Sequence, residues 1–293
     1  MGREHRKVSK VVIPVAGLGS RFLPATKAIP KELLPIIDRP IIHYIVEEAV
    51  EAGISTVVFV ISRPKVSIAD YFDPADITSF RLAEAGKTHL IEDVLELSNK
   101  IDIVSIRQTE AKGLGHAVLT AAPVVEGQNF AVVLGDDVIV SQGSSAIGQC
   151  LENFQARDAG SVVGVLEVPP SETSKYGIVE VDAKNRIRRF VEKPGAGESP
   201  SNWAIPGRYV FESAILDTLR KTPPGKNNEL QLTDAMELML KQAEFHAQPI
   251  EGQRFDTGDK LGYIMANVSF ALEDPQFKKP LKTWLEKKLK EYS

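Results

Sequence analysis

Cysteine is almost absent from this chain of 293 residues, which contains Cys150 and no other cysteine. A single cysteine excludes an internal disulfide and a cysteine-built zinc cluster. The five histidines are scattered and form no HExxH pattern, so a histidine-built zinc site is not expected either. Cys150 falls in a helical pattern over residues 146–154, where we expect a buried structural thiol.

Long apolar runs and an excess of positive charge are missing as well. The longest strongly apolar stretches, such as residues 57–61 and 130–134, are strand-sized, whereas a membrane span needs about 20 residues. The first ten residues contain no apolar signal core, and Arg6 breaks the myristoylation pattern. Lys and Arg number 35 against 39 Asp and Glu, a net charge of -4 that argues against a nucleic-acid binder. We therefore expect a cytoplasmic protein without membrane or nucleic-acid partners.

Strand-like and helical patterns alternate through the first half of the chain. Short buried-strand patterns lie at residues 11–15, 56–61, 102–107 and 130–134. Helical patterns separate them at residues 41–53, 77–98 and 115–121. Strands that are apolar on both faces and are separated by helices predict parallel βαβ units. The expected fold class is α/β, with a mostly parallel mixed sheet and helices on both faces.

The second half of the chain has a different pattern, in which strand-like segments follow one another without a regular alternation with helices. Residues 177–181 and 186–191 alternate around an Ala-Lys-Asn turn at 183–185, which predicts an added β-hairpin. Further strand patterns lie at residues 208–211 and 245–250. The tail at residues 281–289 aligns Leu281, Trp284, Leu285 and Leu289 on one face among lysines. We expect a docked amphipathic helix there, and a contact between subunits is the alternative.

The first strand runs into VAGLGSRFLPATKAIPKELLPIID, a loop suited to binding phosphate. A glycine-rich turn at the carboxyl edge of a parallel sheet leaves backbone N–H groups free for anionic oxygens. Gly17 and Gly19 allow a close backbone approach, and Arg21, Lys27 and Lys31 add three cations. A dinucleotide fingerprint would require a third glycine where Phe22 stands, and no Gly-Lys-Ser/Thr motif for a Walker A loop occurs.

The stretch from residue 17 to residue 35 resembles the signature of the sugar-1-phosphate nucleotidylyltransferases. The resemblance continues in the family's order through Gln108, AKGLGHAV, LGDD, YGIVE, FVEKP, GRYVF, ELQLTDA and FDTGDKLGY. It implies one Rossmann-like nucleotidyltransferase domain over residues 1–293. Residues 1–140 would mainly bind the nucleotide and residues 141–270 the sugar phosphate, followed by a helical tail at 271–293. The likeness is greatest to members that make UDP-glucose and pyrophosphate from UTP and α-D-glucose 1-phosphate.

The resemblance also implies a set of site residues and a Mg²⁺ cofactor. Asp136 and Asp256 each follow a strand pattern, and two carboxylates together with substrate phosphates suit Mg²⁺. By resemblance these two are the metal ligands, although the neighbouring Asp137 leaves that choice open. The implied catalytic cations are Arg21, Lys31 and Lys193. The implied substrate-binding residues are Ala16, Gly17, Glu32, Gln108, Gly113, Gly177 and Glu192. Among these, Gln108 would pair with the imide edge of uracil and Glu192 with sugar hydroxyls.

Two other functions stay open. Thymidylyl transfer to glucose 1-phosphate uses the same chemistry, and no residue pattern separates it from uridylyl transfer. A non-catalytic module that binds nucleotide sugars would be expected to lack Lys31 or the paired aspartates, and the chain has both. Family members commonly assemble as dimers or tetramers, so the resemblance also implies self-association.

Overall fold

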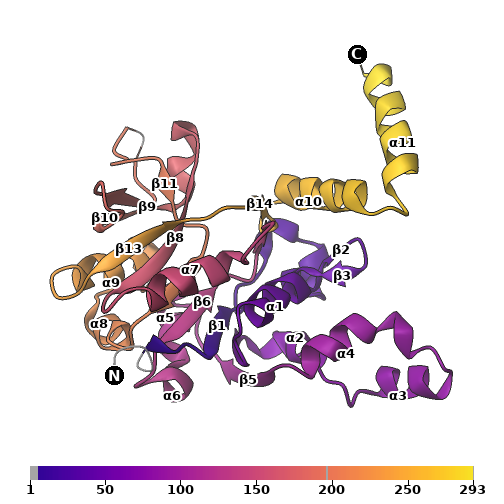
Figure 1. Cartoon of the computed structure of the whole chain (residues 1–293), viewed down its shortest axis with the longest axis horizontal. Helices are drawn as coiled ribbons and strands as arrows, with labels where there is room; N and C mark the ends of the chain where they lie inside the picture. The colour runs from indigo at the N-terminus through magenta and orange to yellow at the C-terminus, as the bar shows by residue number, and fades with distance from the viewer. Residues whose placement is uncertain (1–5, 196, 293) are drawn as a thin grey trace.

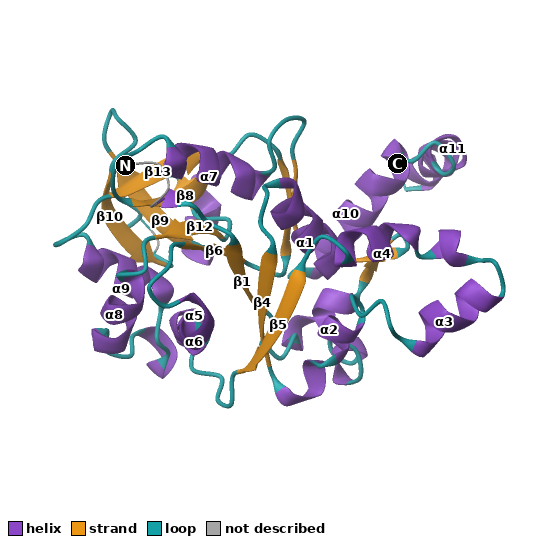
Figure 2. Cartoon of the chain, turned by 60° about the horizontal axis from the view of Figure 1, so that its bottom comes forward, coloured by secondary structure: helices purple, strands orange, loops and turns teal. Residues whose placement is uncertain are grey.

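A ten-stranded mixed sheet forms the centre of the computed structural model, which describes residues 6–195 and 197–292 (Figures 1 and 2). The strand order is β10-β9-β11-β8-β12-β6-β1-β4-β5, with β13 paired beside β8. Seven of these ten strands run in the direction of β1, and the other three are β10, β11 and β12. The predicted α/β class with a mostly parallel mixed sheet is therefore confirmed. The strands of the sheet are β1 (Lys10–Pro14), β4 (Thr56–Ile61), β5 (Asp102–Arg107), β6 (Phe130–Val133), β8 (Ser161–Glu167), β9 (Gly177–Val181), β10 (Ile187–Glu192), β11 (Trp203–Ala204), β12 (Arg208–Phe211) and β13 (Phe245–Pro249).

Helices cover both faces of the sheet, because its central strands are apolar on both sides. Along β1, Val11 and Ile13 pack with one core cluster and Val12 with the other, as alternation in a strand requires. The first cluster includes residues of α1 (Ile41–Glu51), α2 (Ser67–Asp70) and α7 (Ala146–Gln155). The second includes residues of α5 (Leu114–Thr120), α6 (Ala122–Val125), α8 (Ile215–Lys221) and α9 (Leu232–Met239). Cys150 is fully buried in α7, as predicted.

The helical pattern expected over residues 77–98 forms two helices rather than one. These are α3 (Ile77–Glu84) and α4 (Glu92–Ser98), with a 3₁₀ turn between them. Gly86 adopts φ 67° after α3, and Lys87 N–H donates to the Leu82 carbonyl at 2.8 Å, which is a helix-terminating arrangement. The short 3₁₀ turns of the chain are η2 (Ser20–Phe22), η3 (Ala25–Lys27), η4 (Lys31–Leu33), η5 (Arg63–Lys65), η6 (Thr88–Leu90), η7 (Pro170–Lys175) and η8 (Lys226–Asn228).

The predicted hairpin is present as β9 and β10, and its position depends on the length of β8. Ile178 is level with Ala204 and Leu166, whereas Val163 is level with Tyr209 and Val132. The register therefore places Gly177, at the start of β9, just beyond the carboxyl end of β6. The inner end of the hairpin, where Gly177 pairs with Glu192, therefore lies at the edge at which the parallel strands end.

A separate two-stranded sheet joins two distant acidic segments. It pairs β7 (Asp137–Val140) with β14 (Gln253–Asp256) in antiparallel register, with Asp137 opposite Asp256. A second small sheet pairs β2 (Pro35–Ile36) with β3 (Arg39–Pro40) after the glycine-rich loop. Because β7 follows β6 directly, the β7–β14 pair brings the end of β14 to the carboxyl edge of the parallel strands.

The last two helices are α10 (Lys260–Glu273), which packs Ala266 into the first core cluster, and α11 (Lys278–Glu291), which projects from the body of the molecule (Figure 1). The expectation that the tail docks as an amphipathic helix is wrong. No described residue of α11 is buried, and Trp284 is 53% exposed. None of the helices formed by residues 6–195 and 197–292 combines the length and apolar character needed to cross a bilayer.

Candidate active site

The glycine-rich loop after β1 folds back on itself through three 3₁₀ turns. Gly19 adopts φ 65°, and a Cβ built there would lie 3.3 Å from both Lys31 Cβ and Thr26 Cγ2. Thr26 closes the turn by donating its hydroxyl to the Gly19 carbonyl at 2.8 Å. Gly17 is exposed, with no atom within 4 Å of an added Cβ, and Ala16 beside it is half-buried. The loop therefore requires glycine at position 19 and leaves open space over position 17.

Lys31, in the glycine-rich loop, and Asp136, which follows β6, form an ion pair. The Lys31 Nζ lies 2.5 Å from Asp136 Oδ2. Burial disfavours the charged form of each group, but the mutual attraction dominates. The negative charges of Asp136 and Glu32 raise the pKa of Lys31. The positive charge of Lys31 is the main cause that lowers the pKa of Asp136. Both groups are therefore charged at neutral pH.

Asp256 and Arg21 converge on the same point from other segments. A Cβ added to Gly258 would lie 2.6 Å from Asp136 Oδ2 and 3.2 Å from Asp256 Oδ1, so these oxygens flank the space that the glycine leaves. Arg21 reaches this loop and donates from Nη1 to the Gly258 carbonyl at 3.3 Å. The structure thus brings together four of the predicted residues: Arg21, Lys31, Asp136 and Asp256.

Two carboxylate oxygens around one small space fit part of a divalent-cation site. Within the part of the chain that the structure describes, no group of three or more His, Cys, Asp or Glu residues could hold a metal ion. A cation at Asp136 and Asp256 would therefore complete its shell with substrate phosphate oxygens and water, as Mg²⁺ commonly does.

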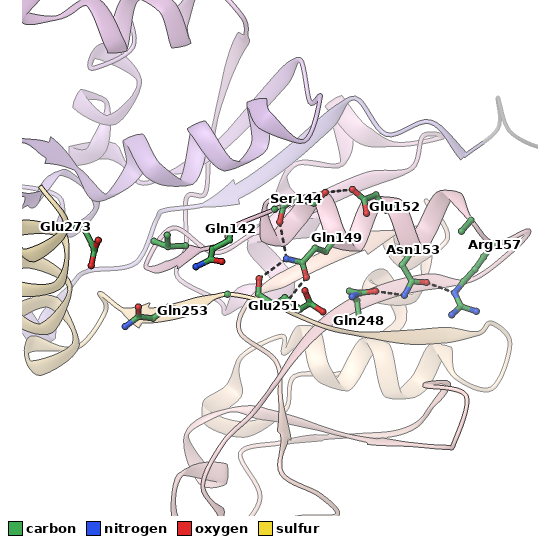
Figure 3. A pocket seen from close by; sticks show the side chains of 14 residues that line it. Gln142, Ser144, Gln149, Glu152, Asn153, Arg157, Gln248, Glu251, Gln253 and Glu273 are labelled. Atoms are coloured by element: carbon green, nitrogen blue, oxygen red, sulfur yellow. Dashed lines mark hydrogen bonds between the residues drawn. The ribbon is translucent and has the colours of Figure 1, made fainter.

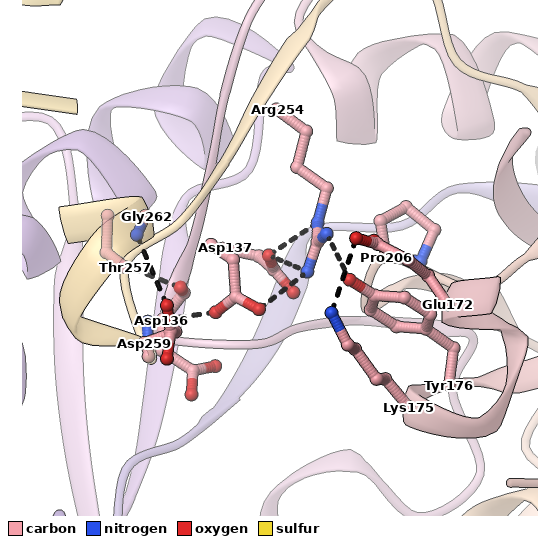
Figure 4. A network of polar contacts seen from close by, with 12 residues as sticks. Asp136, Asp137, Glu172, Lys175, Tyr176, Pro206, Arg254, Thr257, Asp259 and Gly262 are labelled. Carbon is pink, nitrogen blue, oxygen red and sulfur yellow. Dashed lines mark hydrogen bonds and ion pairs between the residues drawn. The ribbon is translucent and has the colours of Figure 1, made fainter. Parts of the chain in front are cut away.

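The doubled aspartates have different surroundings, as Figure 4 shows. Asp136 pairs with Lys31, whereas Asp137 accepts from Arg254 Nε at 2.6 Å. Arg254 also donates to the Tyr176 hydroxyl at 2.9 Å and lies 3.5 Å from Asp256 Oδ2. Burial, followed by repulsion from Asp136 and Asp256, raises the pKa of Asp137 to about 7 despite Arg254. Sequence reasoning missed Arg254 and Tyr176, because the β7–β14 pairing brings Arg254 to Asp137 and Tyr176 reaches Arg254 from the separate segment between η7 and β9.

A second group of predicted residues lies at the inner end of the hairpin. Glu192 is opposite Gly177 in the β9–β10 register, and its Oε2 accepts from Thr233 Oγ1 at 2.7 Å. Lys193 follows with φ 43°, its Nζ 3.2 Å from Glu192 Oε1. The Lys193 side chain is 47% exposed, against 19% for Lys31. Thr233, on α9, holds Glu192 in place and was not singled out in the sequence.

A third group follows β5. Gln108 is 8% exposed, and its Nε2 lies 2.8 Å from His116 Nδ1 and 3.4 Å from the Gly113 carbonyl oxygen. Gly113 adopts φ 95° before α5, where a Cβ would lie 2.8 Å from the Leu230 carbonyl oxygen. Gly113 is therefore required both for its backbone conformation and for the close packing of residue 230.

Glu32 occupies an unexpected environment. Its side chain is 2% exposed, and both carboxylate oxygens accept from Lys65 Nζ, at 3.0 and 2.8 Å. Lys65 is also buried, so the pair is a structural contact beside Lys31. The predicted role of Glu32 in binding the nucleoside stays a prediction.

A wide cleft elsewhere on the molecule contains none of the predicted residues. It has a volume of about 1590 Å³ and lies along α7, β13 and β14 (Figure 3). Its lining is rich in amides and carboxylates, including Gln149, Glu152, Glu251 and Glu273, with Arg157 as its cation. A triphosphate needs several cations, so the charge of this lining does not suit a nucleotide.

The fold and the cation-lined sheet edge define a nucleotidyl transferase, and comparison with known proteins agrees. The chain belongs to the nucleotidyl transferase family, whose model matches residues 10–272, and the predicted resemblance is thereby confirmed. It is 44% identical over 285 residues to a UTP–glucose-1-phosphate uridylyltransferase of Staphylococcus epidermidis, which covers 96% of this chain and 98% of that protein.

Solved structures give the same result. A UDP-glucose pyrophosphorylase complexed with UDP-glucose matches with a TM-score of 0.84 and 38% identity, covering 92% of this chain and 100% of that chain. A UTP-bound UGPase from Acinetobacter baumannii matches with a TM-score of 0.87 and 36% identity, covering 95% and 99%. Each likeness therefore extends over nearly the whole chain.

Proposed function

We propose that this protein transfers uridylyl from UTP to α-D-glucose 1-phosphate and releases pyrophosphate, with UDP-glucose as the second product. The observation that carries the proposal is the convergence of Lys31, Asp136 and Asp256 from three distant segments at one sheet edge. The relative that is 44% identical over nearly the whole chain is a uridylyltransferase, which favours uridylyl over thymidylyl transfer.

The reaction needs charge neutralisation more than proton transfer. A phosphate monoester has a second pKa near about 6, so the attacking oxygen is already mostly deprotonated at neutral pH. It attacks the α-phosphorus of UTP in line, and the bond to the pyrophosphate oxygen breaks. Arg21 and Lys31 stabilise the triphosphate and the departing pyrophosphate, and Lys193 aligns the attacking phosphate. The roles of these three cations are predictions, and the substitutions of Lys31 and Lys193 described below test two of them.

Asp136 and Asp256 would hold a Mg²⁺ ion in the space beside Gly258. When bound, such an ion would neutralise negative charge on the phosphate oxygens. The contact of Asp137 with Arg254 supports Asp136, rather than Asp137, as the ligand from this pair.

The remaining predicted residues divide between the two substrates. We assign the nucleoside to Ala16, Gly17, Glu32, Gln108 and Gly113, which precede the Asp136 loop in the chain. We assign the sugar phosphate to Gly177, Glu192 and Lys193 at the inner end of the hairpin. Support for this division comes from the register, which places Gly177 just beyond the carboxyl end of β6.

The direct test is release of pyrophosphate from UTP, measured with and without glucose 1-phosphate and with and without Mg²⁺. We expect release only when all three are present. Faster turnover of dTTP would indicate the thymidylyl alternative instead. Binding of UDP-glucose without any pyrophosphate release would indicate a non-catalytic module.

We further propose that residues 1–293 act as one domain in the cytoplasm and that copies associate as dimers or tetramers. The continuous sheet, which passes from β6 into β12, supports a single domain. Support for association comes from exposed apolar side chains on α10 and α11, including Leu261, Ile264, Met265 and Trp284. Light scattering on the wild type and on a Trp284→Glu variant tests this, with a reduced mass expected for the variant.

A further inference from the structure

The side chain of His116 contacts Gln108, the residue to which we assign recognition of the base. Which of the two side chains donates the hydrogen bond decides how the Gln108 amide is oriented. His116 lies on the first turn of α5, and Gln108 lies at the end of β5, so the loop of residues 109–113 folds back to join them. The contact is between Gln108 Nε2 and His116 Nδ1 at 2.8 Å. On its own it has two interpretations, because an amide can flip and a neutral imidazole can place its proton on either nitrogen.

The Gly113 carbonyl removes that ambiguity. A carbonyl oxygen only accepts hydrogen bonds, and it lies 3.4 Å from the same Gln108 nitrogen. The amide end that faces both His116 and Gly113 is therefore the NH₂ group. It follows that His116 Nδ1 is an acceptor, which requires a neutral imidazole with its proton on Nε2.

The surroundings of His116 favour that neutral form. Burial and the positive charge of Lys112 lower the pKa of His116, while Glu110 acts in the opposite direction. The N-terminus of α5 also disfavours a positive charge on its first turn. The imidazole therefore stays an acceptor for the Gln108 NH₂ group at neutral pH.

The other end of the amide is left for a ligand. Gln108 is 8% exposed, and no donor among residues 6–195 and 197–292 pairs with its Oε1. Among the described residues, this oxygen is not one of the side-chain atoms that are buried without a partner, so it is accessible to water, which the donor of a ligand can replace. Uracil has an N–H donor at N3, whereas cytosine presents a lone pair at that position.

We propose that His116 is a positioning residue that fixes the Gln108 amide with its oxygen toward the base, so that the site selects pyrimidines with an N3–H donor. The proposal rests on the proposed function in assigning the base to Gln108. It explains how a symmetric-looking amide distinguishes UTP from CTP, because a flipped amide would suit cytosine instead. His116 touches no reacting atom and acts only through Gln108.

The test is the ratio of kcat/KM for UTP to kcat/KM for CTP in a set of variants. His116→Ala removes the acceptor and lets the amide flip, so we expect the ratio to fall about tenfold, the equivalent of one lost hydrogen bond. His116→Asp places an acceptor-only oxygen where Nδ1 stood and should keep the ratio near the wild-type value. Since both nucleotides carry the same triphosphate, the added charge largely cancels in the ratio.

A double-mutant cycle and a matched control complete the design. In a Gln108→Ala background, His116→Ala should change the ratio no further, because no amide is left to orient. His89→Ala removes an exposed histidine in η6 and should leave the ratio unchanged. Thermal melts check folding, and His116→Leu replaces the Ala variant if that variant does not fold.

An unchanged ratio in the apolar variant that folds, or a loss in His116→Asp as large as in that variant, overturns the proposal. Failure of the proposed function has a different signature, namely no pyrophosphate release by the wild type with UTP and glucose 1-phosphate. In that case the same variants are compared by calorimetry, with the ratio of the UTP and CTP dissociation constants as the measured quantity.

Discussion

The parallel and antiparallel halves of the sheet position their polar groups by different means. In the parallel half, β1, β5 and β6 end at one edge, so the loops that carry Gly17, Gln108 and Asp136 meet there by topology alone. In the antiparallel half the direction alternates, and Gly177 begins a strand whereas Glu192 ends one. The hairpin reaches the site only because β8 extends past that edge. In a parallel sheet, the sequence pattern of the strands therefore predicts the edge at which the polar loops meet. In an antiparallel extension, the strand pattern alone does not predict which residues reach that edge.

The largest expected effect comes from cutting the connection between the two halves. Arg208 of β12 is fully buried and forms a bidentate ion pair with Glu48 of α1, at 3.0 and 2.5 Å. It also donates to the Asp137 carbonyl at 2.6 Å. Arg208→Met leaves Glu48 buried and unpaired, so we expect the free energy of unfolding to fall by about 3–5 kcal/mol in urea titrations.

Arg220→Met is the matched control for that substitution. Arg220 forms exposed ion pairs with Glu126 and Asp217, which solvent screens, so its loss should change stability far less than the loss of Arg208. Equal destabilisation by the two variants would show that the buried pair does not hold the halves together.

The second prediction compares one cation from each half. Lys31→Ala and Lys193→Ala should each lower kcat by roughly 10²–10³, because each removes a group that stabilises developing charge. Lys31 lies in the partly buried ion pair and Lys193 is half exposed, so we expect the larger loss for Lys31. Steady-state kinetics measure both, with Lys184→Ala at the exposed hairpin turn as the control. Wild-type turnover in either variant removes that lysine from the mechanism.

The third prediction concerns the space beside Gly258, where the β14 segment meets the parallel half. Gly258→Ala would put a Cβ 2.6 Å from Asp136 Oδ2. We expect the Mg²⁺ concentration for half-maximal activity to rise about 10- to 100-fold, as for other changes next to a metal site. Gly143→Ala adds the same methyl group where no atom lies within 4 Å and should have no effect. An unchanged Mg²⁺ response in Gly258→Ala would place the metal elsewhere.

The smallest effect is a pH dependence confined to the parallel half. His43 on α1 is buried, and burial together with Arg39 lowers its pKa to about 4. The His43 imidazole takes up a proton near pH 6.5 in the unfolded chain, but only near pH 4 in the folded chain. Stability is therefore full above pH 6.5 and is lost as the pH falls through that window.

His43→Gln should remove this contribution. Between pH 7 and pH 4 we expect the free energy of unfolding of the wild type to fall by on the order of 1–3 kcal/mol more than that of the variant. Parallel pH dependences in the two proteins would contradict a depressed histidine pKa.

Local patterns in the sequence determined the fold class and most of the strands. The residues of β4, β5, β9 and β12 are the ones that the sequence patterns predicted, because short apolar or alternating runs of strand length are distinctive in composition. The glycine loop with its cations, and the doubled aspartate after an apolar strand, predicted a phosphate-binding edge in the same way, and Lys31 and Asp136 do meet there. Each of these features depends on neighbours that lie within a few residues.

Only the tertiary structure decided which side chains meet and in which direction they point. Asp136 and Asp137 are adjacent in sequence, yet one contacts Lys31 and the other Arg254, because β7 pairs with β14 from a segment more than a hundred residues later. The orientation of the Gln108 amide likewise depends on the Gly113 carbonyl and His116. The tail helix has an amphipathic pattern, but its apolar residues stay unburied in the single chain. Long-range register and packing decide such contacts, and hydrophobic periodicity along a chain carries no information about them.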